Sequence, residues 1–88
     1  CYIIGEIGSN HNRDLATAKR LIEVCAESGC NAAKFQTYTA EGLYSKFTPR
    51  ISEMEGRTKP KETPFEVIDR IKIPWEWHEE LKLHAQKC

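Results

Sequence analysis

Three polar residues stand near the ends of two short apolar segments of the chain: Glu6 in the first segment, and Lys34 and Gln36 in the second. A carboxylate, an ammonium group and an amide can together move a proton, neutralise an anion and hydrogen-bond a hydroxyl group. A lysine in this place would suit a phosphate or a carboxylate. Whether the three residues act together depends on whether the fold brings the two segments side by side.

The chain around these residues has the pattern of a strand, a helix and a second strand. Residues 2–7 are apolar, rich in isoleucine and followed by glycine, and residues 32–37 form a second short segment of this kind, so both are predicted strands. Between them, Asp14 suits the N-cap of a helix and Gly29 suits its C-terminal stop. A connection of this length makes the two strands parallel, with a right-handed crossover.

Side chains alternate across a strand, so each predicted strand has a helix-facing side and an opposite side. The helix-facing side is expected to be small or apolar: Ile3, Gly5, Ile7, Ala33, Phe35 and Thr37. Glu6, Lys34 and Gln36 fall on the opposite side, near the C-terminal ends of the strands. That side is the interior of a closed parallel barrel, and the same rim binds ligands in an open sheet. The residues therefore form either an active site or a structural Glu6–Lys34 ion pair, and their place at the strand ends favours an active site.

The loop of residues 9–12 follows the first strand and faces the same rim. Helix-entry capping explains part of its polar character but explains Asn10 and His11 less well, so these two are candidate ligand-binding residues. His78 and His84 are six positions apart on an expected helix and point to different sides, which does not match zinc-ligand spacing.

Composition excludes some classes of partner. The 88 residues include 13 basic and 13 acidic side chains, which argues against a nucleic acid or an anionic membrane bound through bulk charge. No apolar run approaches the roughly 18 residues that span a bilayer. The four cysteines show no metal-binding spacing and are expected to be free thiols in a reducing cytosol, so we predict a cytoplasmic location.

The second half of the chain is less regular. Residues 38–61 have no clear period and are expected to form a long loop, either a lid or a disordered segment. Thr63 to Glu66 has the pattern of a capping box that begins a short helix ending near Ile71, and another helix is expected from Pro74. Both ends of the chain look cut, which predicts one partial domain over residues 1–88.

Three segments resemble motifs of the sialic acid synthase family. Residues 3–12 (IIGEIGSNHN) resemble its opening motif, residues 33–37 (AKFQT) its second-strand motif, and residues 73–81 (IPWEWHEEL) the helix before its third strand. The likeness covers nearly the whole chain and is weakest across residues 44–62. The family usually has alanine, glycine and valine at three positions that differ here: Gly5, Arg13 and Ala33.

The resemblance implies an α/β fold in which residues 1–88 are the N-terminal fragment of a (β/α)₈ TIM barrel: strand, helix, strand, loop and helix. The remaining strands and any C-terminal antifreeze-like domain would be absent. The implied activity is that of a transferase, an N-acetylneuraminate or other nonulosonic acid synthase. It condenses phosphoenolpyruvate with an N-acetylated hexosamine such as N-acetylmannosamine and releases phosphate, and the fragment alone would be inactive.

The resemblance also implies roles for individual residues. Lys34 would neutralise phosphoenolpyruvate, Gln36 would hydrogen-bond the sugar, and Glu6 would position the sugar or a metal-bound water and move a proton. A divalent metal, Mn²⁺ or Mg²⁺, would polarise the sugar aldehyde, with ligands on later strands outside this chain. The complete enzyme would be a homodimer. The alternatives are another phosphoenolpyruvate-condensing sugar-acid synthase, or a non-catalytic remnant that binds a sugar or a protein.

Overall fold

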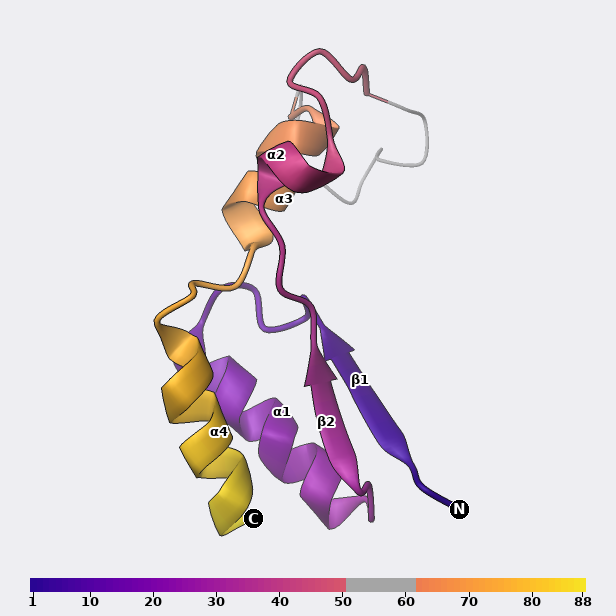
Figure 1. Ribbon diagram of the computed structural model, residues 1–88, viewed down its shortest axis with the longest axis vertical. Helices are drawn as coiled ribbons and strands as arrows, with labels where there is room; N and C mark the ends of the chain where they lie inside the picture. The colour runs from indigo at the N-terminus through magenta and orange to yellow at the C-terminus, as the bar shows by residue number, and fades with distance from the viewer. Residues whose placement is uncertain (51–61) are drawn as a thin grey trace. The chain divides into compact units, whose positions relative to one another are not determined.

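The computed structural model describes residues 1–50 and 62–88. They form two strands and four helices (Figure 1): β1 (Ile4–Gly8), α1 (Leu15–Glu27), β2 (Ala32–Phe35), α2 (Ala40–Leu43), α3 (Pro64–Ile71) and α4 (Trp77–Lys87). The chain divides into two compact units, one of residues 1–37 with 73–88 and one of residues 38–72. The expectation of a lid or disorder falls partly on residues 51–61, which lie outside the described residues.

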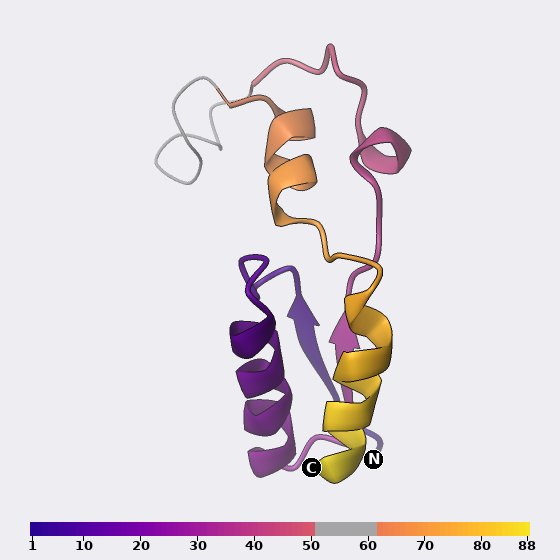
Figure 2. The ribbon, with the colours of Figure 1, turned by 90° about the vertical axis from the view of Figure 1, so that its left-hand side faces the viewer.

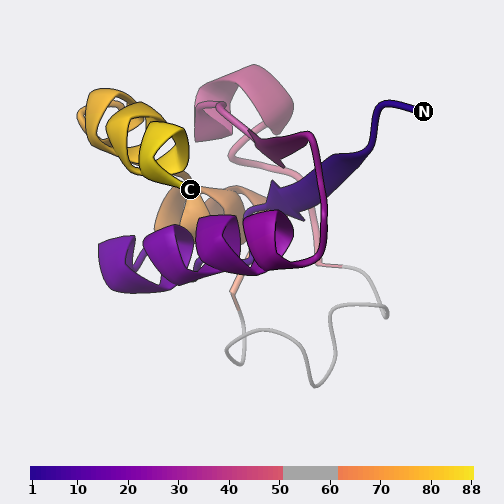
Figure 3. The same cartoon turned by 90° about the horizontal axis from the view of Figure 1, so that it is seen from below.

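The first unit is a parallel β1–β2 pair whose one face is covered by α1 and α4. The two strands are hydrogen-bonded neighbours and run in the same direction, as predicted. The two helices lie side by side in front of the strands in Figure 2, and Figure 3 shows both on the same side of the sheet. The predicted strand, helix, strand unit is therefore confirmed.

The helix α1 begins and ends at the residues predicted from the sequence. Asp14 is its N-cap, and the carboxylate accepts a hydrogen bond from the backbone N–H of Thr17 at 3.2 Å. At the other end Gly29 adopts φ +85°, a left-handed conformation that glycine takes at little cost. This glycine turns the chain directly into β2.

The core of the first unit lies between the sheet and the two helices. Its buried members come from all parts of the unit: Ile7, Ala18, Ile22, Ile73 and Leu81. Phe35 and Trp77 pack against them. The predicted helix-facing side is confirmed for Ile7 and Phe35, whereas Ile3 is 52% exposed because it precedes the paired part of β1.

Four element boundaries differ from the prediction. β1 runs from Ile4 to Gly8 instead of from Tyr2 to Ile7. β2 ends at Phe35 instead of Thr37, because β1 turns away at Gly8. Beyond Phe35, Gln36 N–H makes only a long hydrogen bond of 3.5 Å to the Gly8 carbonyl. α4 begins at Trp77 and not at Pro74, because the first bonds after Pro74 join residues three apart and form turns before the regular helix.

The second unit contains α2 and α3, and the sequence predicted only the second of these. Thr63 caps α3 through a 3.2 Å hydrogen bond from Glu66 N–H, as expected. Ahead of it, the buried Glu62 forms an ion pair with Arg70 at 2.8 Å. α2 has only four residues, too few for a helical period, although Thr39 caps it by accepting from Gly42 N–H at 3.1 Å.

Within the described part of the chain, none of the helices has the length and apolar character needed to cross a bilayer.

Candidate functional site

The fold brings Glu6, Lys34 and Gln36 together at the C-terminal ends of the strands; we call these residues the rim cluster. Glu6 and Lys34 are cross-strand partners in the parallel register. The Lys34 ammonium donates a 2.8 Å hydrogen bond to Glu6 Oε2. Their neighbours Ile7 and Phe35 face the core, so alternation places the rim cluster on the other side of the sheet, as predicted.

Gly8 makes room for the rim cluster, a role that the sequence analysis did not assign to it. The register shifts between Glu6 and Gly8, and Gly8 adopts φ +59°. A β-carbon built on Gly8 would lie 3.2 Å from Gln36 Oε1 and 3.2 Å from Glu6 Oε1. These contacts also show that the Gln36 amide and the Glu6 carboxylate approach the same point. The available sequence signal was a glycine two residues after an acid at a strand end.

The Glu6–Lys34 pair lies on the side of the sheet that α1 and α4 leave uncovered. The side chains are 53% and 52% exposed, and ion pairs at such sites typically contribute about 0–1 kcal/mol. Exposure on a two-stranded sheet does not distinguish an active site from a structural ion pair, so both interpretations stay open.

His11 lies in the core, away from the rim cluster. Its side chain has 0% exposure, and its ring packs edge-on to Trp77 at 5.7 Å and tilted against Phe35 at 6.2 Å. Nδ1 accepts a 2.9 Å hydrogen bond from Arg13 N–H, so the proton of the neutral ring is assigned to Nε2. Burial lowers the pKa of His11. The contacts describe a neutral ring that anchors the loop, and a ligand role for His11 remains a prediction.

Asn10 is exposed, and its side-chain amide closes the turn after β1. Its Nδ2 donates to the Ile7 carbonyl at 2.8 Å, and its backbone N–H donates to the same oxygen at 3.1 Å. Asn10 therefore combines a structural contact within the turn with an exposed position in the loop. Its predicted ligand role is left open by the geometry.

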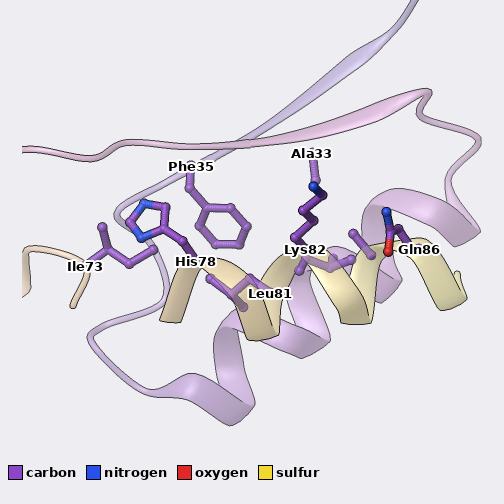
Figure 4. A pocket seen from close by; sticks show the side chains of 9 residues that line it. Ala33, Phe35, Ile73, His78, Leu81, Lys82 and Gln86 are labelled. Atoms are coloured by element: carbon purple, nitrogen blue, oxygen red, sulfur yellow. The ribbon is translucent and has the colours of Figure 1, made fainter. Parts of the chain in front are cut away.

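A second polar contact joins β2's end to α4, and the sequence analysis did not foresee it. His78 Nδ1 lies 2.8 Å from the Trp75 carbonyl, which requires Nδ1 to donate, so Nε2 accepts from the Thr37 hydroxyl at 2.8 Å. His78 borders an apolar cavity of about 390 Å³ between β2 and α4, where Phe35 and Leu81 form the walls (Figure 4). The signal missed was a histidine one turn after Pro74.

Metal ligands are scarce in the described ranges. No three His, Cys, Asp or Glu side chains among residues 1–50 and 62–88 gather closely enough to hold a metal ion. At the rim cluster, Glu6 is the single carboxylate. The described residues therefore do not fit a metal centre of their own.

Comparison with known proteins identifies the family. Residues 21–88 match the NeuB family. The chain is 37% identical to an N,N'-diacetyllegionaminic acid synthase of Campylobacter jejuni, over 98% of this chain and 26% of that protein. It is 39% identical to a pseudaminic acid synthase of Helicobacter pylori, over 97% of this chain and 25% of that protein. A human N-acetylneuraminate-9-phosphate synthase is 46% identical over 52% of this chain and 13% of its own length.

These matches identify the α/β segment as part of a sugar-acid synthase family. The chain belongs to the NeuB family, which confirms the resemblance to sialic acid synthases. It spans about a quarter of the length of the first two relatives.

Proposed function

We propose that residues 1–88 form the first part of the (β/α)₈ barrel of a nonulosonic acid synthase, which condenses phosphoenolpyruvate with an N-acetylated hexosamine and releases phosphate. The observation that carries this proposal is the Glu6–Lys34 pair, held in register across two parallel strands with Gln36 beside it. The match to the NeuB family and the names of the relatives support the reaction class.

The uncovered side of the sheet supports the barrel. Among the described residues the sheet has two strands, so each strand keeps one edge without a strand partner. Tyr2 and Ile4 precede Glu6 on this side and are 68% and 56% exposed. Open strand edges and exposed isoleucine are unfavourable in water, and the strands of a closed barrel would cover both.

The groups of the rim cluster divide the chemistry between them. The Lys34 ammonium would bind the phosphate or carboxylate of phosphoenolpyruvate through a charge-assisted hydrogen bond. The Gln36 amide can donate to and accept from sugar hydroxyls. The Glu6 carboxylate accepts hydrogen bonds, so it would orient a hydroxyl or a water and take up a proton during the reaction. The ion pair would open to admit the anionic substrate.

A divalent metal, Mn²⁺ or Mg²⁺, would supply Lewis-acid chemistry when bound. As the resemblance to sialic acid synthases implies, we expect its ligands on later strands, outside residues 1–88. Residues 1–50 and 62–88 hold no cluster of three His, Cys, Asp or Glu side chains that could bind it. The steps assigned above to Glu6, Lys34 and Gln36 do not depend on it.

The direct test is phosphate release from phosphoenolpyruvate by the complete protein that carries these residues, with a panel of N-acetylated hexosamines. We expect release only when an N-acetylated sugar such as N-acetylmannosamine is present. Release with a sugar phosphate that lacks the N-acetyl group would favour another phosphoenolpyruvate-condensing synthase. Binding of sugar without any phosphate release would favour the non-catalytic remnant and contradict the proposal.

A further inference from the structure

The C-terminal end of α1 brings Cys25 and Cys30 together. Cys30 N–H donates to the Cys25 carbonyl at 3.0 Å, and Gly29 N–H donates to the Ala26 carbonyl at 3.1 Å. These two bonds, with Gly29 in the left-handed conformation, define a Schellman motif, in which the first and last side chains of the turn contact each other. That contact is usually hydrophobic, and here both side chains are thiols.

Gly5 of β1 provides the space for the two sulfurs. A β-carbon built on Gly5 would lie 2.5 Å from Cys25 Sγ and 3.2 Å from Cys30 Sγ, so both sulfurs occupy the volume where a larger residue would stand. Both cysteines also line a cavity of about 230 Å³ beside Asn31. Both cysteine residues are partly exposed. A small reagent can therefore reach the pair through this cavity.

We propose that Cys25 and Cys30 form a dithiol site that closes into an intramolecular disulfide by exchange with a small-molecule disulfide. One thiolate attacks the reagent and releases one thiol, which leaves a mixed disulfide on the protein. The second thiolate then attacks the bound sulfur and releases the second thiol. The protein loses two electrons and two protons, and the reagent disulfide is reduced to two thiols.

The thiols differ from reactive catalytic cysteines in one respect. Burial, reinforced by the neighbouring Cys30, raises the pKa of Cys25 above its ordinary value. The Cys25 thiolate is therefore scarce at neutral pH, and closure should accelerate as the pH rises.

Cys88 is the rival partner, because it borders the same cavity. Its Sγ contacts the His84 carbonyl at 3.4 Å, on α4. The turn that joins Cys25 to Cys30 is short and fixed by two backbone bonds, which favours that pair over a bridge to the chain's last residue. The test must distinguish the two pairings.

The experiment treats the folded complete protein with oxidised glutathione, blocks remaining thiols with an alkylating reagent, and maps tryptic peptides by mass spectrometry. Cleavage after Arg20 and Lys34 leaves both cysteines on the single peptide of residues 21–34. We expect this peptide to lose the mass of two hydrogens, with no alkylation and no attached glutathione. Cys88→Ser should give the same peptide, and Cys30→Ser should instead leave glutathione or the alkyl group on Cys25.

Three results would overturn the proposal. One is stable glutathione on either cysteine of the wild-type peptide. Another is a crosslink from this peptide to Cys88. The third is full alkylation of both thiols in the folded protein when the urea-unfolded protein does form the disulfide.

Discussion

At the scale of single residues, His11 couples the loop after β1 to the core. Its ring is fully buried, accepts from Arg13 N–H and contacts Trp77, and its pKa is lowered by burial. The unfolded chain binds a proton near pH 6.5, whereas the folded chain resists protonation. The contribution of His11 to the free energy of unfolding should therefore be fully present above about pH 6.5. Below that pH it should decline, by up to about 1.4 kcal/mol per pH unit.

His11→Asn tests this pH dependence, because the Asn carbonyl can still accept from Arg13 N–H but does not titrate. We expect the variant to be less stable at neutral pH and to lose less stability than the wild type as the pH falls. Urea unfolding at several pH values measures both. Equal slopes for the two proteins below about pH 6.5 would contradict a buried neutral imidazole.

The Cys25 sulfur occupies the space where a side chain at position 5 would lie. Gly5→Ala places a carbon 2.5 Å from Cys25 Sγ, so the sulfur must move, and overpacking of this kind typically costs about 1–3 kcal/mol. In the Cys25→Ala background the same change should cost much less. A double-mutant cycle in urea measures the coupling. Independent, additive effects of the two substitutions would show that the sulfur does not occupy the space above Gly5.

At the scale of elements, the loop that leads into α1 contains a strained residue. Arg13 adopts φ +53°, a left-handed conformation that costs a residue with a side chain about 1–2 kcal/mol. The sialic acid synthase family usually has glycine here. Arg13→Gly should relieve the strain and retain the backbone bond to His11, for a net gain of up to about 1 kcal/mol after the added flexibility of the unfolded chain.

The matched control is Arg20→Gly, in the middle of α1. This change should cost about 1 kcal/mol, because glycine weakens the interior of a helix. The exposed ion pairs of Arg20 with Glu23 and Glu27 are also lost. Chemical denaturation of the two variants gives the comparison. Destabilisation of equal size at both positions would argue against the left-handed conformation of Arg13.

The elements of the first unit could be predicted because each has a local signal. Asp14 marks the start of α1 and Gly29 its end, through hydrogen bonds to backbone groups only a few residues away. Alternation along β1 and β2 assigns Glu6 and Lys34 to one side of the sheet. The place of His11 could not be predicted in this way. His11 lies in a loop, and its burial depends on Trp77, which is distant in the chain and begins helix α4.

Within the site, the Glu6–Lys34 pair follows from strand register, which the pattern of apolar residues defines. Two other features depend on distances between different segments of the chain: the space that Gly8 leaves for the rim cluster, and the Thr37–His78 contact. The periodicity of apolar residues in the sequence does not encode such distances. The helix α2 was missed because four residues show no period.

At the scale of the whole molecule, residues 1–50 and 62–88 leave much apolar surface in water. Tyr2, Ile3 and Ile4 are more than half exposed, and each strand of the sheet has one edge without a strand partner among these residues. We expect the isolated chain to have low stability, to associate, and to be inactive. Size-exclusion chromatography and thermal unfolding test this expectation. A monomer with a sharp cooperative transition would contradict the view that these residues are completed by further barrel strands.

The central claim is that Lys34 binds phosphoenolpyruvate, and steady-state kinetics of Lys34→Ala in the complete protein test it most directly. Lys19→Ala is the matched control, because Lys19 also pairs with a glutamate, Glu80, on the helical surface of the same unit. Loss of a charged hydrogen bond typically costs about 1.5–3 kcal/mol, or roughly a tenfold to hundredfold effect. We predict a fall of this size in kcat/KM for phosphoenolpyruvate, with a much smaller change in KM for the sugar and none in Lys19→Ala. Unchanged kinetics for phosphoenolpyruvate in Lys34→Ala would contradict the account.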